Sequence, residues 1–210
     1  MNEIQTISST EANISTEVTE RQAHRTLTGS VYSIPYFACN IAVKKMLEDG
    51  ILKEKDTIYN PLKSDGMLGK VLEHYHFNVK ETDFGYRSAR TGAKKADIWN
   101  IKDNTHDIVM TVLPSQQKQK KYIIDECLRI ANKKFIAIVP ITFLAGRKKY
   151  QSNFFECLSK VYIYSDRVSI YDMTSELTDR NLRTGKVTYA LLVWDFDKDT
   201  SKSPEFGFLI

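Results

Sequence analysis

The stretch DTIYNPLKSDGMLGKVLEHY, residues 56–75, decides the fold class. Its first part is a short apolar run broken by Pro61, which predicts a strand that ends in a loop. From Gly66 onward the apolar residues recur at helical spacing, which predicts a helix. A buried strand followed by a turn and a helix is typical of α/β domains.

The same alternation continues on both sides of this stretch. The apolar spacing predicts further helices at 35–50, 118–133 and 144–158. Short runs rich in β-branched residues predict further strands at 77–83, 106–113, 134–140, 160–166 and 187–197. Short buried strands that alternate with helices indicate an α/β domain with a mostly parallel central sheet.

Composition separates an N-terminal arm from this domain. Residues 1–30 are rich in Ser, Thr and Glu and contain no aromatic residue, so we expect a flexible arm there and one domain over 31–210. The longest apolar runs are far shorter than the roughly 20 residues that span a bilayer, and no signal peptide is visible. The three cysteines are widely spaced and predict neither disulfides nor a metal site. We therefore expect a cytoplasmic protein.

The turns after the predicted strands resemble those of S-adenosylmethionine-dependent methyltransferases, specifically the DNA adenine-N6 enzymes of phages and plasmids, over about residues 31–200. The family has a loop of the type E-P-x-x-G-x-G after its first strand. Here the loop is NPLKSDG, in which Pro61, Asp65 and Gly66 match. Asn60 stands in place of the acid, and Ser64 in place of the first glycine.

The resemblance implies a Rossmann-like methyltransferase fold and a set of cofactor contacts. An acidic residue that ends the second strand holds the cofactor ribose in the family, and Asp83 occupies that place. Asp97, in the sequence ADIW, corresponds to an acid beside the adenine. If the cofactor site is retained, the residues that bind S-adenosylmethionine are Asn60, Pro61, Asp65, Gly66, Asp83 and Asp97.

The catalytic motif is where the chain departs most from the family. There the fourth strand ends in Asn or Asp, then Pro-Pro and an aromatic residue; here the stretch DIVMTVLPS, residues 107–115, ends in Val112, Leu113, Pro114 and Ser115. The family's Asn oxygen accepts an N–H of the target amine, and its aromatic ring stacks on the flipped base. Valine offers no acceptor and serine offers no ring.

These replacements predict a catalytically inactive protein. A lost base–aromatic stack costs roughly 1–3 kcal/mol and a lost hydrogen bond a similar amount, which together slow a reaction by about 10²–10⁴. Ser64 and the bulky Lys63 also argue against a tightly bound cofactor, so no cofactor is expected. The alternative is an active adenine methyltransferase in which the hydroxyl of Thr111 or Ser115 accepts the hydrogen bond.

Two basic clusters flank the expected substrate face and suit contacts with nucleic-acid phosphates. The nucleic-acid-binding candidates are Lys118, Lys120, Lys121, Arg147, Lys148 and Lys149. The competing interpretation is that they are solvated helix faces. We expect a nucleic-acid-binding or regulatory module, of phage or other mobile-element type, whose partners are DNA or a protein. It could pair with an active methyltransferase or form a homo-oligomer; a protein-interaction module without nucleic acid is the further alternative.

Overall fold

The computed structural model describes most of the predicted domain. The described residues are 32–83, 92–113, 120–145, 155–172, 187–199 and 202–210. Its helices are α2 (Tyr36–Glu48), α3 (Met67–His74) and α5 (Lys120–Ile130), with short 3₁₀ helices η1 (Ile98–Asn100) and η2 (Ile141–Leu144). Its strands are β1 (Tyr32–Ser33), β2 (Thr57–Asn60), β3 (Asn78–Asp83), β4 (Lys94–Lys95), β5 (His106–Val112), β6 (Ala131–Pro140), β7 (Leu158–Tyr164), β8 (Tyr171–Asp172), β9 (Tyr189–Asp195) and β10 (Glu205–Leu209).

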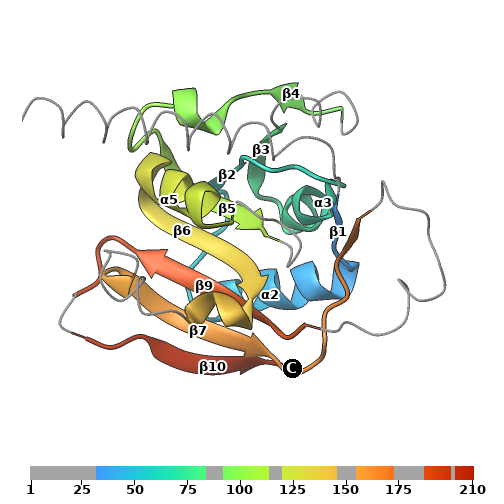
Figure 1. Ribbon diagram of the computed structural model, residues 1–210, viewed down its shortest axis with the longest axis vertical. Coiled ribbons are helices and arrows are strands. Elements are labelled where there is room, and N and C mark those ends of the chain that lie inside the picture. Colours follow the sequence, from blue (N-terminus) through green and yellow to red (C-terminus); the bar gives the residue numbers. More distant parts are fainter. Residues whose placement is uncertain (1–31, 84–91, 114–119, 146–154, 173–186, 200–201) are drawn as a thin grey trace, which may run out of the picture.

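One eight-stranded sheet forms the centre of the molecule (Figure 1). Its strand order is β10-β7-β9-β6-β5-β2-β3-β4. Every neighbouring pair is parallel except the two pairs that β9 makes with β6 and β7. The prediction of an α/β fold with a mostly parallel sheet is therefore confirmed. A separate two-stranded sheet pairs β1 with β8 in antiparallel orientation.

The sheet is buried between two apolar layers. α2 and α3 pack on one face together with Ile58 of β2, and α5 packs on the other face together with Tyr59 of the same strand. Residues that neighbour each other in a strand point to opposite faces, so each buried strand needs apolar residues at nearly every position. β9 meets this requirement because six of its seven residues are buried.

Some boundaries differ from those predicted from the sequence. α5 ends at Ile130 and β6 begins at the next residue, three positions before the predicted start of that strand. The side chains of Asn132 and Lys133, at this polar start of the strand, both bind the carboxylate of Asp107 in β5. Apolar spacing does not detect such a polar strand end.

Four short strands were not predicted at all, namely β1, β4, β8 and the edge strand β10. Of the helix predicted at 144–158, residues 146–154 lie outside the described part of the chain. Leu144 ends η2, and Leu158 begins β7. The predicted arm, residues 1–30, also lies outside the described residues.

Candidate active site

The loop after β2 is tied to its own surroundings through Asn60. The side chain of Asn60 is buried, its Oδ1 accepts the backbone N–H of Leu62 at 3.1 Å, and its Nδ2 donates to Oε1 of Glu81 at 3.0 Å. Both ends of this amide thus have partners inside the protein. The family that the loop resembles has an acid at this position; in this chain the residue closes a turn and holds the neighbouring strand.

Ser64 connects the same loop to two other segments. Its backbone N–H donates to Oδ2 of Asp83 at 3.1 Å. Its hydroxyl donates to the carbonyl oxygen of Tyr32 at 2.6 Å and accepts the N–H of Tyr32 at 2.8 Å. The φ angle of Ser64 is 56°, in the left-handed region that glycine adopts at lower cost. The three hydrogen bonds offset the strain of holding serine in this conformation.

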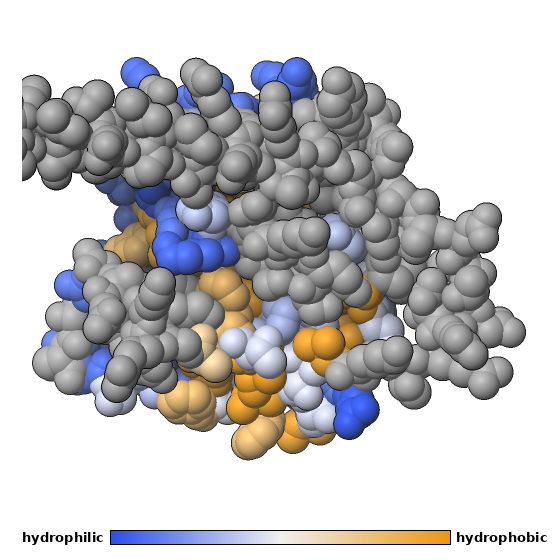
Figure 2. All heavy atoms as spheres, viewed as in Figure 1, coloured by the Kyte–Doolittle hydropathy of each residue, from blue (hydrophilic) through white to orange (hydrophobic). Residues whose placement is uncertain are grey.

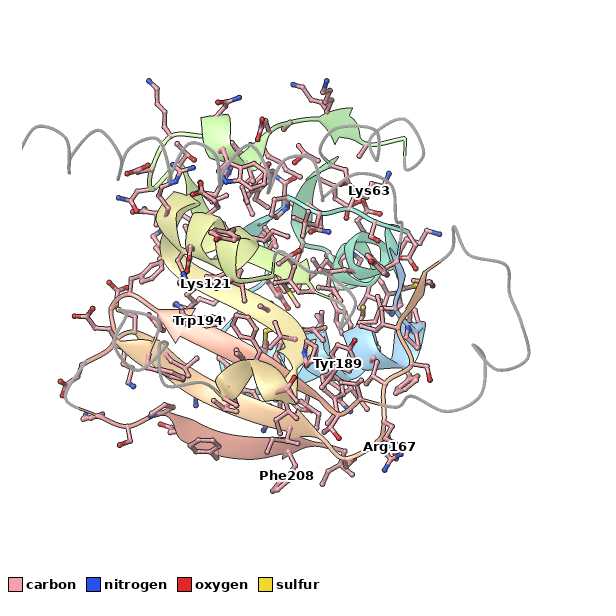
Figure 3. The ribbon with its side chains drawn as sticks, viewed as in Figure 1. Lys63, Lys121, Arg167, Tyr189, Trp194 and Phe208 are labelled. Carbon is pink, nitrogen blue, oxygen red and sulfur yellow. The ribbon has the colours of Figure 1, made fainter. Side chains whose placement is uncertain are left out.

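Asp65 and Gly66 complete the loop and begin α3. Oδ1 of Asp65 accepts the backbone N–H of Met67 at 3.0 Å, which satisfies one of the free donors at the start of the helix. Gly66 has a φ of 76°, and a Cβ atom on it would lie 3.2 Å from Cε of Lys63. Lys63 therefore folds back over the loop; Figure 3 places it at the α3 side of the sheet. Pro61 is buried beside these residues.

Little space remains where this loop faces β5. The cavity between the loop, β1 and the end of β5 has a volume of about 10 Å³, and it is lined by Tyr32, Ile34, Asn60, Leu62, Lys63, Ser64, Asp65, Leu68, Val112 and Ile170. That volume is close to the space needed for one water molecule, whereas ligand pockets occupy roughly 300–1,000 Å³.

The end of β3 carries two carboxylates on one face. Asp83 is fully buried, in the place predicted from the resemblance, and it binds the loop through Ser64. Glu81 was not singled out from the sequence. Its carboxylate lies against α3 so closely that a Cβ on Gly69 would be 2.5 Å from Oε1. Burial raises the pKa of Glu81, against the opposing effect of the Asn60 hydrogen bond.

Asp97 lies close to the end of β3. The backbone N–H of Ala96 donates to the carbonyl oxygen of Asp83 at 3.0 Å, which brings the two acidic positions together. Oδ1 of Asp97 accepts the N–H of Trp99 at 3.2 Å and caps η1. The carboxylate thus has a structural role at the start of that short helix.

The end of β5 offers no polar group to a substrate among its described residues. Val112 lines the small cavity, and Leu113 is fully buried with its N–H bound to the carbonyl oxygen of Ile138. Thr111 is buried as well, and its Oγ1 has no hydrogen-bond partner. Because Thr111 and Val112 are adjacent in a strand, they point to opposite faces, so Thr111 does not face the cavity that Val112 lines. Pro114 and Ser115 lie outside the described residues.

Most of the basic candidates also lie outside the described part of the chain, namely Lys118, Arg147, Lys148 and Lys149. Lys120 begins α5, but its side chain is not described. Lys121 is exposed on the same helix (Figure 3). Its Nζ forms an ion pair of 2.7 Å with Oδ2 of Asp125. The described residues therefore neither assemble nor exclude a basic surface around this helix.

No protein-family model matches the chain, and no curated protein matches it. Among solved structures it is similar to the methyltransferase subunit of a type I restriction-modification system from Streptococcus thermophilus, with a TM-score of 0.53 and 10% identity. That alignment covers 80% of this chain and 45% of the subunit, so the chain spans just under half of that subunit's length.

Weaker similarities involve two other methyltransferases. A putative sarcosine dimethylglycine methyltransferase from Galdieria sulphuraria has a TM-score of 0.46 and 13% identity, over 80% of this chain and 86% of that one. Geranyl diphosphate C-methyltransferase from Streptomyces coelicolor has a TM-score of 0.43 and 13% identity, over 73% and 78%.

The chain has a methyltransferase-like fold. The sheet order and the restriction-modification neighbour support this conclusion together. At 10% identity the likeness concerns the fold and not the chemistry. Within the described ranges no group of three His, Cys, Asp or Glu side chains could hold a metal ion, and no helix there is long and apolar enough to cross a membrane.

Proposed function

We propose that this chain is a catalytically inactive methyltransferase-like protein that acts as a nucleic-acid-binding or regulatory module. The observation that carries the first half of the proposal is the small cavity at the first loop. The polar groups that would meet a cofactor are bonded to each other, through Asn60 to Glu81 and through Ser64 to Asp83 and Tyr32. A cofactor would have to break these bonds before it could form its own.

The end of β5 supports the same conclusion. An exocyclic amine becomes nucleophilic when acceptors localise its lone pair, and the position of the family's acceptor is occupied by Val112, whose side chain has none. The neighbouring hydroxyl of Thr111 is buried in the layer that faces α5. Neither residue supplies the hydrogen bond that the reaction needs.

The nucleic-acid role rests on the basic residues around α5 and after β6. Phosphate contacts by lysine and arginine provide most of the affinity in non-specific binding and make it steeply salt-dependent. The neighbour with the highest quoted TM-score is a subunit of a restriction-modification system, which agrees with such a role. A non-catalytic partner of an active methyltransferase is one form that a regulatory module would take.

Fluorescence anisotropy with labelled double-stranded DNA and RNA at 50–200 mM salt, roughly the range over which such binding weakens, tests this role. We expect binding that weakens as salt rises and that falls when Lys120, Lys121, Arg147 and Lys148 are changed to alanine together. The matched control changes four exposed lysines elsewhere, Lys44, Lys53, Lys70 and Lys202. Equal binding by both quadruple variants would contradict the assignment of this surface.

A protein-interaction module is the second candidate, and the edge strand β10 favours it. Phe206 and Phe208 are 71% and 64% exposed, and they lie on one face of a strand with only one partner in the described sheet. Hydrophobic residues gather at the lower edge of Figure 2, where Figure 1 shows β10, and Figure 3 shows Phe208 pointing outward. Absence of DNA and RNA binding at low salt would favour this candidate.

A further inference from the structure

A second cavity lies on the other face of the sheet, away from the first loop. It has a volume of about 460 Å³, within the range of small-molecule sites, and its lining residues are Tyr59, Lys80, Glu81, Thr82, Lys94, Ala96 and His106. We call it the β3 groove because β3 supplies three of them. The chain between β4 and β5 forms only the three-residue helix η1, and α5 packs on β5, β6 and η1. Among the described residues, none that lines the groove belongs to a helix.

The inner wall of the groove is aromatic and held in place. The rings of Tyr59 and His106 are stacked, with centroids 3.9 Å apart and an interplanar angle of 19°. The hydroxyl groups of Tyr59 and Thr82 are hydrogen-bonded at 2.6 Å. A register irregularity between His106 and Ile108 allows the histidine to point to the same face as Tyr59.

The rim of the groove is basic. Lys80 of β3 and Lys94 of β4 are both exposed and line the cavity. Burial, followed by the positive charge of Lys80, lowers the pKa of His106. Glu81 also lines the groove, but its carboxylate is hydrogen-bonded to Asn60 on the opposite face of the sheet. The exposed charges at the rim are thus positive.

We propose that the β3 groove binds a nucleotide, with the base against the Tyr59–His106 pair and the phosphate between Lys80 and Lys94. A flat aromatic wall suits a base of any sequence, and two ammonium groups complement a phosphate. The same chemistry is offered by a free nucleotide and by one unit of a single strand. Binding of a single strand rests on the proposed nucleic-acid role, whereas binding of a free nucleotide does not.

The experiment is a titration of the full chain, with ¹³C-labelled histidine, by adenosine monophosphate and separately by a ten-nucleotide deoxyadenosine strand. Comparison with His106→Gln assigns the His106 signal among the four histidines of the chain. We expect this signal to shift with at least one of the two ligands. A shift with the monophosphate identifies a free nucleotide as sufficient, and a shift with the strand alone identifies a unit of nucleic acid.

Charge variants provide the second readout. Lys80→Glu with Lys94→Glu should weaken binding at least tenfold and, for the strand, reduce the slope of log affinity against log salt by about 0.7, the value for one phosphate contact. Lys44→Glu with Lys202→Glu, exposed and at other parts of the fold, should leave both unchanged. Thermal unfolding of each variant confirms that it is folded.

Either of two results would overturn the proposal: a His106 signal that neither ligand shifts, or a Lys80→Glu, Lys94→Glu variant that binds as the wild type does. A wrong assignment of DNA binding to the basic residues around α5 and after β6 would give a different result from both. The variant with Lys120, Lys121, Arg147 and Lys148 replaced would then bind DNA normally while the His106 shift with adenosine monophosphate persisted.

Discussion

The contact between Glu81 and Gly69 makes a quantitative prediction for the first loop. Gly69→Ala places a methyl group 2.5 Å from Oε1 of Glu81, so the carboxylate has to leave α3. The hydrogen bond from Asn60 is then lost, and a buried donor without a partner costs about 1–3 kcal/mol. Alanine recovers about 1 kcal/mol of helix propensity. The net change in unfolding free energy is a destabilisation of about 0–2 kcal/mol.

A double-mutant cycle separates the two effects. In a Glu81→Ala background the methyl group has space and the hydrogen bond is already absent, so Gly69→Ala should stabilise the protein by about 1 kcal/mol. The coupling energy between the two positions is therefore about 1–3 kcal/mol. Urea unfolding followed by the fluorescence of the buried Trp194 measures each variant. Lys70→Ala, at the next and exposed position of α3, is the control and should change stability by less than about 0.5 kcal/mol.

The reasoning is refuted if Gly69→Ala stabilises the wild type as much as it stabilises the Glu81→Ala variant. That result would mean that the carboxylate does not rest on α3. The contact with α3 would then not help to hold Glu81 in its hydrogen bond with Asn60 of the first loop.

Three further predictions concern other parts of the fold. Because burial raises the pKa of Glu81 above its ordinary value of 4.5, the folded state binds the proton more tightly. The unfolding free energy of the wild type relative to Glu81→Gln should therefore fall as pH rises from 4.5 through the raised pKa; a rise would contradict this. Thr111→Val removes a buried hydroxyl without a partner and should stabilise by about 1 kcal/mol in urea unfolding, whereas a loss of that size would indicate a hidden partner. Gly207→Ala brings a Cβ within 2.9 Å of the Tyr162 ring and should destabilise by about 1–3 kcal/mol, while Phe208→Ala, at an exposed position, should change stability by less than about 0.5 kcal/mol.

The sequence predicted the sheet because its strands are buried on both faces. Such strands are continuous apolar runs, as in β6 and β9, and these can be recognised without a structure. The edge strand β10 was missed for the converse reason. Its outward residues Phe206 and Phe208 are exposed, and its five residues give no helical or buried-strand pattern.

The sequence located the candidate residues along the chain but not their contacts, and their roles in binding a cofactor stay predictions. Asn60, Asp83 and Asp97 lie at the ends of strands and turns, as the order of the motifs indicated. Glu81 was missed although strand alternation places it on the same face as Asp83. The role of Ser64 in binding Tyr32, 32 residues away, depends on a long-range contact that no local pattern encodes.

The central claim is that the first loop no longer holds a cofactor, and isothermal calorimetry of the full chain with S-adenosylmethionine and S-adenosylhomocysteine tests it most directly. The account predicts no heat of binding for either ligand up to millimolar concentration, because the cavity of about 10 Å³ and the internally bonded loop leave them no site. Micromolar binding of either ligand would contradict it, and would show that the loop rearranges to accept the cofactor.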